Sequence, residues 1–153
     1  MSNPATSPIL DNPLTSYLRD DPVRSLLRSV YGSDTPRNVF SVVSTGGGGA
    51  FGNWCFSTPG SSRSIMSFEI PYSRAALTNY VYCNSFSGSK DFEHPPALGC
   101  TKETALILSK AACHNAANNF LRDESSNIAS LGQSNIFGVS CTAALVSEEV
   151  KNC

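Results

Sequence analysis

A short apolar segment followed directly by four glycines constrains the fold of this chain more than any other feature. Residues 38–44 are rich in β-branched and aromatic side chains, and residues 46–49 are all glycine. The segment is bounded by Pro36 and by the glycines, so it is too short for an independent helix and predicts a buried strand. Residues 50–56 predict the start of a helix. The unit is therefore a strand, a glycine turn and a helix, as in α/β folds.

The rest of the chain continues this alternation. Apolar spacing predicts a helix at 14–31, or two short helices broken near Pro22. It then predicts a second strand at 64–70, helices at 73–82 and 101–122, and a third strand at 135–142. Residues 58–62 and 84–99 predict loops. Strands that alternate with helices favour a parallel or mixed sheet covered on both faces. Residues 1–13 carry three prolines and predict a flexible arm, so the domain is expected over residues 14–153.

Composition excludes several classes of function. The chain has 153 residues, enough for one domain, and a formal net charge of −1, which gives no electrostatic reason to bind nucleic acid or an anionic membrane. No apolar stretch is long enough for a spanning helix, and the polar N-terminus does not resemble a secretory signal. We therefore expect neither nucleic acid nor a membrane as partner.

The cysteines favour a reducing compartment. Six cysteines stand at wide, irregular spacings without a C-x-x-C pair, which is typical of reduced thiols and predicts a cytoplasmic or nuclear protein. His94 and His114 have no ligand spacing with any cysteine pair, so no metal site is expected.

The glycine turn has the chemistry of an anion site. Four glycines allow the backbone to approach a ligand closely, and the helix that follows points free N–H groups at the turn, which suits a phosphate. Ser44 and Thr45 add hydroxyl groups. The alternative is a tight turn without a ligand.

The same turn also matches a dinucleotide fingerprint, Gly47-x-Gly49-x-x-Gly52. The match is weak evidence, because a run of glycines readily produces it by chance. Glu69 is the one acidic residue placed to follow a second strand, 17 residues after Gly52. It either accepts a hydrogen bond from a ribose hydroxyl or is an outward-facing charge at the sheet edge.

Five segments together resemble the C-terminal domain of the CinA family, also called the nicotinamide-nucleotide amidase domain. They are Ser-Thr-Gly-Gly at 44–47, Thr-Pro-Gly-Ser-Ser at 58–62, Pro-Tyr-Ser-Arg at 71–74, Cys-Thr-Lys-Glu-Thr-Ala at 100–105 and Gly-Val-Ser-Cys-Thr at 138–142. Bacterial members carry E-S-C-T-G-G, V-P-G-x-S and Y-S-N-x-x-K in the same order, then a helix start and a late G-x-x-x-T-G. The glycine-rich form is closer to a divergent, eukaryote-type branch associated with nicotinamide-nucleotide adenylyltransferases.

The resemblance implies a fold, a ligand and a set of residues. The fold is a three-layer α/β/α domain around a small mixed sheet. The ligand is nicotinamide mononucleotide or a related phosphate-bearing nucleotide, no cofactor is required, and the family's reaction releases ammonia from the nicotinamide group. The implied ligand-binding residues are Thr45, Gly46, Gly47, Gly48, Gly49, Ser73, Arg74 and Thr142, and the candidate catalytic residues are Ser44 and Tyr72.

The chain departs from the family at the reactive positions. The family's serine and its preceding glutamate align with Val43 and Val42, and its lysine aligns with Leu77. Valine and leucine can neither attack a carbonyl group nor transfer a proton. Two interpretations remain open: a pyridine-nucleotide-binding domain of amidase ancestry, or a non-catalytic regulatory or interaction module acting with an adenylyltransferase.

The C-terminal end of the resemblance carries a further expectation. Family members continue past the position of Thr142 into at least one more strand, whereas residues 143–150 do not have the pattern of a strand. The domain is thus expected to be cut short and to leave an uncovered sheet edge. The chain is then either a marginally stable monomer or a homo-oligomer that pairs through that edge.

Overall fold

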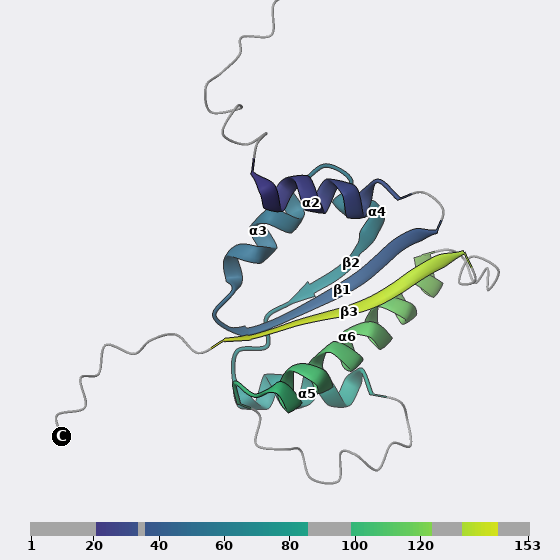
Figure 1. Cartoon of the computed structure of the whole chain (residues 1–153). Coiled ribbons are helices and arrows are strands. Elements are labelled where there is room, and N and C mark those ends of the chain that lie inside the picture. Colours follow the sequence, from purple (N-terminus) through teal and green to yellow (C-terminus); the bar gives the residue numbers. More distant parts are fainter. Residues whose placement is uncertain (1–20, 34–35, 86–98, 124–132, 144–153) are drawn as a thin grey trace, which may run out of the picture.

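The computed structural model describes residues 21–33, 36–85, 99–123 and 133–143 (Figure 1). Its elements, in chain order, are α2 (Pro22–Tyr31), β1 (Arg37–Gly46), α3 (Gly49–Ser57), α4 (Ser61–Ser64), β2 (Ile65–Glu69), α5 (Arg74–Cys83), α6 (Lys102–Asp123) and β3 (Ser134–Ala143). The predicted loop at 84–99, the N-terminal arm and the chain after Ala143 lie largely or wholly outside the described residues.

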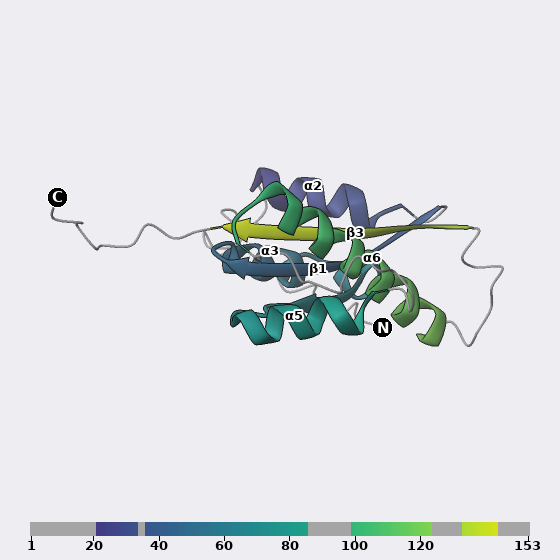
Figure 2. The ribbon, with the colours of Figure 1, turned by 90° about the horizontal axis from the view of Figure 1, so that it is seen from below.

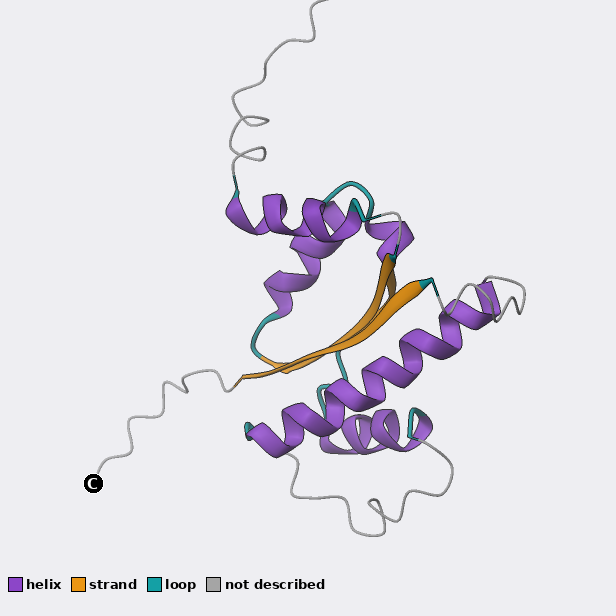
Figure 3. Cartoon of the chain, turned by 45° about the vertical axis from the view of Figure 1, so that its right-hand side comes forward, coloured by secondary structure: helices purple, strands orange, loops and turns teal. Residues whose placement is uncertain are grey.

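The three strands form one parallel sheet in the order β2-β1-β3. Figure 2 shows β1 and β3 side by side with their arrows in the same direction. The small mixed sheet was therefore a wrong expectation for the described residues. Each connection between strands contains helices, and such a crossover returns the chain to a parallel strand. The helices lie in two layers, with α2, α3 and α4 over one face of the sheet and α5 and α6 over the other (Figure 3).

Local signals explain most element boundaries. The predicted break near Pro22 is the beginning of α2, where Asp21 caps the helix by accepting a hydrogen bond from the Val23 N–H at 2.9 Å. Proline fits there because the first helical N–H has no partner within the helix. Thr101 caps α6 as predicted, since its hydroxyl oxygen accepts from the Thr104 N–H at 3.2 Å. The predicted loop at 58–62 was too long, because α4 begins at Ser61.

β1 is the middle strand and separates two hydrophobic clusters. Neighbouring side chains of a strand point to opposite faces, so Val42 and Val43 enter different clusters. Val42 packs with residues of α2, α3 and β2, including Leu27, Cys55 and Ile65. Val43 packs with residues of α5 and α6, including Leu77 and Leu108. Both valines are fully buried, so β1 is the core element on which both helical layers rest.

β3 lies at an edge of the described sheet and is covered on one face. Gly138 is packed against α6, while Phe137 and Val139, on the opposite face, are 48% and 37% exposed. The expected uncovered edge, and association through it, stay predictions, because the residues that follow β3 lie outside the described part of the chain. No described helix combines the length and apolar character that crossing a membrane requires.

Replacing Gly138 with alanine should destabilise the fold. A Cβ atom there would overlap the Ser109 carbonyl oxygen and the Cys113 backbone nitrogen of α6, so the helix and the strand would have to separate. We expect a loss of at least about 2 kcal/mol in the free energy of unfolding, measured by urea denaturation. Gly49→Ala is the matched control, because a Cβ at Gly49 has no neighbouring atom within 4 Å. Equal stability of the two variants would contradict the close packing of β3 on α6.

Candidate functional site

The ligand-binding residues implied by the resemblance gather at the carboxyl ends of the strands. β1 ends at Gly46, and the register pairs Thr45 with Thr142 and Gly46 with Ala143 of β3. Ser73 and Arg74 follow β2 and begin α5. In open parallel sheets ligands bind at this edge, because the loops and helix N-termini that follow the strands meet there. Segments far apart in the sequence thus share one edge of the sheet (Figure 1).

The glycine turn joins the end of β1 to the beginning of α3 and is fixed against β3. Gly46 and Gly48 have φ angles of +78° and +94°, which residues with a side chain rarely adopt. The Gly47 N–H donates to the Ala143 carbonyl at 2.8 Å, and a Cβ at Gly46 would overlap that same oxygen. The turn is therefore built from glycine for steric reasons, with or without a ligand.

The beginning of α3 is open. Gly48 is the N-cap residue and provides no side-chain hydrogen bond, and Gly49 has no atom within 4 Å of the position of a Cβ. Gly52, the third glycine of the fingerprint, has another role, since its Cβ would meet the Phe68 ring at 3.1 Å. It allows α3 to pack closely on β2, which is the function of the third glycine in dinucleotide-binding units.

Three helices begin at this edge. α3 follows β1, α5 follows β2, and the first turn of α6 lies beside β3, where the Ser140 hydroxyl donates to the Ala105 carbonyl at 2.7 Å. Arg74 and Lys102 are the first residues of α5 and α6, and both are exposed. Glu103 in the first turn of α6 and Glu69 at the end of β2 carry the opposite charge at the same edge, so the attraction for an anion comes from the helix N-termini and not from a surplus of cationic side chains.

The two candidate catalytic residues do not come together. Ser44 is 2% exposed and lies on the α3 face of the sheet, where its hydroxyl donates to the Gly47 carbonyl at 3.1 Å. Tyr72 lies beyond the end of β2 and is 72% exposed. The serine supports the turn, and no described base lies within hydrogen-bond distance of it.

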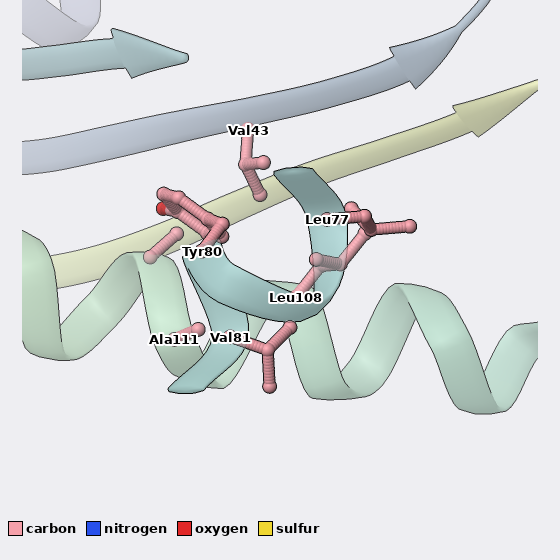
Figure 4. Close-up of a cluster of buried hydrophobic side chains, with 7 residues drawn as sticks. Val43, Leu77, Tyr80, Val81, Leu108 and Ala111 are labelled. Carbon is pink, nitrogen blue, oxygen red and sulfur yellow. The ribbon is translucent and has the colours of Figure 1, made fainter. Parts of the chain in front are cut away.

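The positions that align with the family's serine and lysine do come together. Val43 of β1 and Leu77 of α5 belong to one buried cluster, with Tyr80, Val81 and Leu108 (Figure 4). Hydrocarbon side chains therefore occupy the place where the resemblance would put a nucleophile and its lysine. The cluster stabilises the fold by burial, and apart from the Tyr80 hydroxyl its side chains are hydrocarbon, with no base that could activate a nucleophile.

Sequence reasoning missed a polar cluster beside this apolar one. The Asn115 side-chain amide of α6 donates to Ser67 Oγ at 2.9 Å and to Glu69 Oε1 at 2.8 Å, both on β2. Ser67 Oγ in turn donates to Ser41 Oγ of β1 at 3.0 Å. Glu69 is thus half-buried and turned toward α6, so the alternative of an outward-facing charge was wrong. Asn115 has helical neighbours in sequence, and no motif marked it.

Tyr80 is the unusual member of this region. It is 5% exposed, and its hydroxyl oxygen is buried without a hydrogen-bond partner of acceptable geometry among the described residues. Burial, and then the neighbouring Glu69 carboxylate, raise the pKa of Tyr80 to about 12, although the nearby Asn115 amide acts in the opposite direction. An unsatisfied buried hydroxyl is costly and indicates a place where a polar partner would be stabilising.

Two further observations limit the chemistry. Within the described residues, no three His, Cys, Asp or Glu side chains come close enough to hold a metal ion, and the five described cysteines are free thiols. Comparison with protein-family models, with curated proteins and with solved structures finds no match for this chain. The likeness to the CinA domain therefore stays a prediction that rests on the five segments.

Replacing Tyr80 with phenylalanine tests the state of the hydroxyl. Because that hydroxyl has no hydrogen-bond partner of acceptable geometry among the described residues, we expect the free energy of unfolding at pH 7 to change by less than about 1 kcal/mol. The pKa of Tyr80 is raised in the folded state, so the tyrosine ionises first in the unfolded chain. Its contribution to the free energy of unfolding is therefore constant below pH 10 and is lost between pH 10 and about pH 12. Thermal melts over this pH range should show a smaller fall in melting temperature for Tyr80→Phe than for the wild type. A large destabilisation at pH 7 would mean that the hydroxyl has a partner.

Proposed function

We propose that this chain is a pyridine-nucleotide-binding domain of CinA type that binds the phosphate of nicotinamide mononucleotide and does not hydrolyse its amide. The observation that carries the proposal is the open beginning of α3, a glycine-lined turn at the carboxyl end of the middle strand. The five-segment resemblance names the ligand, and the geometry supports its phosphate group.

Electrostatics at the edge favours an anion. Each helix carries about half a positive charge at its N-terminus, and the N-termini of α3, α5 and α6 share this edge. Ser73 and Thr101 already cap α5 and α6 by accepting hydrogen bonds from backbone N–H groups, whereas α3 has no side-chain cap. A phosphate oxygen would act as the missing acceptor at α3, as at other helix N-termini that bind anions.

The reactive chemistry of an amidase has no support in this chain. Hydrolysis of an amide needs an activated nucleophile, and the aligned position holds the buried Val43 next to Leu77. Ser44 faces the other side of the sheet and uses its proton in the bond to Gly47. The same apolar cluster favours the second candidate, a non-catalytic regulatory or interaction module that acts with a nicotinamide-nucleotide adenylyltransferase and senses the nucleotide.

Replacing Gly49 with aspartate should have opposite effects on stability and on binding. A carboxylate in the first turn of α3 interacts favourably with the helix dipole, so we expect the free energy of unfolding to rise by about 0.3–1 kcal/mol. The same charge repels a phosphate, so the affinity for nicotinamide mononucleotide should fall at least about tenfold, which is about 1.4 kcal/mol. Calorimetry measures binding, and thermal denaturation measures stability.

Asn53→Asp is the matched control, because it adds the same charge at an exposed position of the same helix, further from the turn. It should leave nucleotide affinity within about twofold of the wild type. If Gly49→Asp binds as tightly as Asn53→Asp, the phosphate does not lie at α3. If the wild type binds no mononucleotide at all, the proposal fails.

The chain should release no ammonia from nicotinamide mononucleotide above the uncatalysed background. Loss of a nucleophile removes several orders of magnitude of rate, because no other described side chain takes its place at Val43. A coupled ammonia assay over many hours, with the enzyme-free solution as reference, makes the measurement. Multiple turnovers that disappear in Ser44→Ala would contradict the prediction and make Ser44 the nucleophile.

A further inference from the structure

A second pocket lies beside the polar cluster, between the end of β2 and α5. Its volume is about 370 Å³, within the range of small-molecule sites. One side of the pocket is apolar and is formed by Ile70 and Pro71. The other residues carry polar groups, and they include Glu69, Asn79, Tyr80 and Asn84. The glycine turn is not part of this lining, so the pocket is a distinct site.

The pocket offers hydrogen-bond acceptors. Among the described residues, Glu69 receives a hydrogen bond only at Oε1, from Asn115, which leaves Oε2 to a ligand. Asn84 donates its side-chain N–H to the Tyr80 carbonyl at 2.8 Å, and its Oδ1 has no described donor. A carboxylate without a cationic partner at a half-buried position is a strong acceptor for O–H groups.

The pocket also offers donors. The Tyr80 hydroxyl lies beside Glu69 and Asn115, but it is fully buried and does not reach a ligand. Asn79 accepts at Oδ1 from the Cys83 thiol at 3.6 Å, which leaves its amide N–H groups to a ligand. A bound amine would donate to Glu69 but has no acceptor for the Asn79 N–H groups, and a bound carboxylate would be repelled by Glu69. Hydroxyl groups meet both demands, because each one donates and accepts.

We propose that this pocket is a subsite for a vicinal diol of the kind carried by a ribosyl group, with Glu69 accepting from the diol and Asn79 donating to it. Glu69 is the last residue of β2, the strand that follows the glycine turn and its helix. In dinucleotide-binding units an acidic residue at this position binds the ribose of the nucleotide held by the glycine turn, whereas Glu69 is turned toward α6 and its pocket does not include the turn. Ile70 and Pro71 supply the apolar wall against which the carbon face of the sugar packs. The subsite does not depend on the phosphate site at α3.

The test uses phosphate-free nucleosides and the side-chain amides of asparagine as reporters. Adenosine is titrated into ¹⁵N-labelled protein, and 2′-deoxyadenosine, which lacks the diol, is the matched ligand. Adenosine should shift the amide resonances of Asn79 and Asn84, while those of Asn38 and Asn135, which bond to each other at the opposite end of the sheet, stay unchanged. The deoxynucleoside should bind at least about tenfold more weakly, the effect of one hydrogen bond to a charged acceptor.

Two variants separate the diol contact from a structural effect. Glu69→Gln keeps an oxygen for Asn115 but replaces the free acceptor with a donor, so adenosine affinity should fall at least about tenfold. Glu103→Gln, which removes the same charge from the exposed first turn of α6, should bind adenosine normally.

The outcomes are distinguishable from those at α3. Gly49→Asp should weaken binding of nicotinamide mononucleotide and leave adenosine binding intact. If adenosine leaves Asn79 and Asn84 unshifted, or binds Glu69→Gln and the wild type equally, the diol subsite is wrong, whatever happens at the glycine turn. If the deoxynucleoside binds as tightly as adenosine, the pocket recognises the base instead and the proposal is overturned.

Discussion

Burial of β1 on both faces is the constraint on which the rest of the structure depends. Val42 and Val43 are neighbours in sequence, yet each is the centre of a different hydrophobic cluster, because side chains alternate along a strand. The strand also carries hydrogen bonds along both edges, to β2 and to β3. Every described layer therefore contacts this one segment. Its carboxyl end is consequently a fixed point, from which the glycine turn departs.

The two candidate sites follow from the two faces of that strand. On the α3 face, Ser44 supports the turn through Gly47, and α3 begins without a side-chain cap. On the α5 and α6 face, polar residues continue where the apolar cluster ends, from Ser41 through Asn115 to Glu69. Buried polar groups are tolerated when they are hydrogen-bonded to one another, and Tyr80 is the exception in this region. The first face favours an anion and the second favours hydroxyl groups.

The proposed function depends as much on what fills the catalytic positions as on what surrounds them. Val43 and Leu77 are distant in sequence but belong to one cluster, as the serine and lysine of an amidase would have to be. Hydrocarbon side chains at these two positions stabilise the core by packing, but they cannot attack or protonate a substrate. This packing is what the proposed function requires of a domain that binds a nucleotide at the strand ends and does not hydrolyse its amide.

The sequence alone determined the elements of the described structure, because periodicity, caps and glycines act locally: β1, the turn, α3, α5, α6 and β3 lie close to their predicted positions. It also determined that Val43 and Leu77 cannot catalyse. Only the tertiary structure decided that the sheet is parallel, since strand direction depends on how the crossovers pack. Alternation along β1 turns Ser44 away from Val43, but tertiary contacts decided that Leu77 packs with Val43, and that Glu69 and Asn115, 46 residues apart, share a hydrogen bond. Long-range pairing of this kind leaves no periodic pattern in the sequence, because it depends on which faces meet after the helices dock.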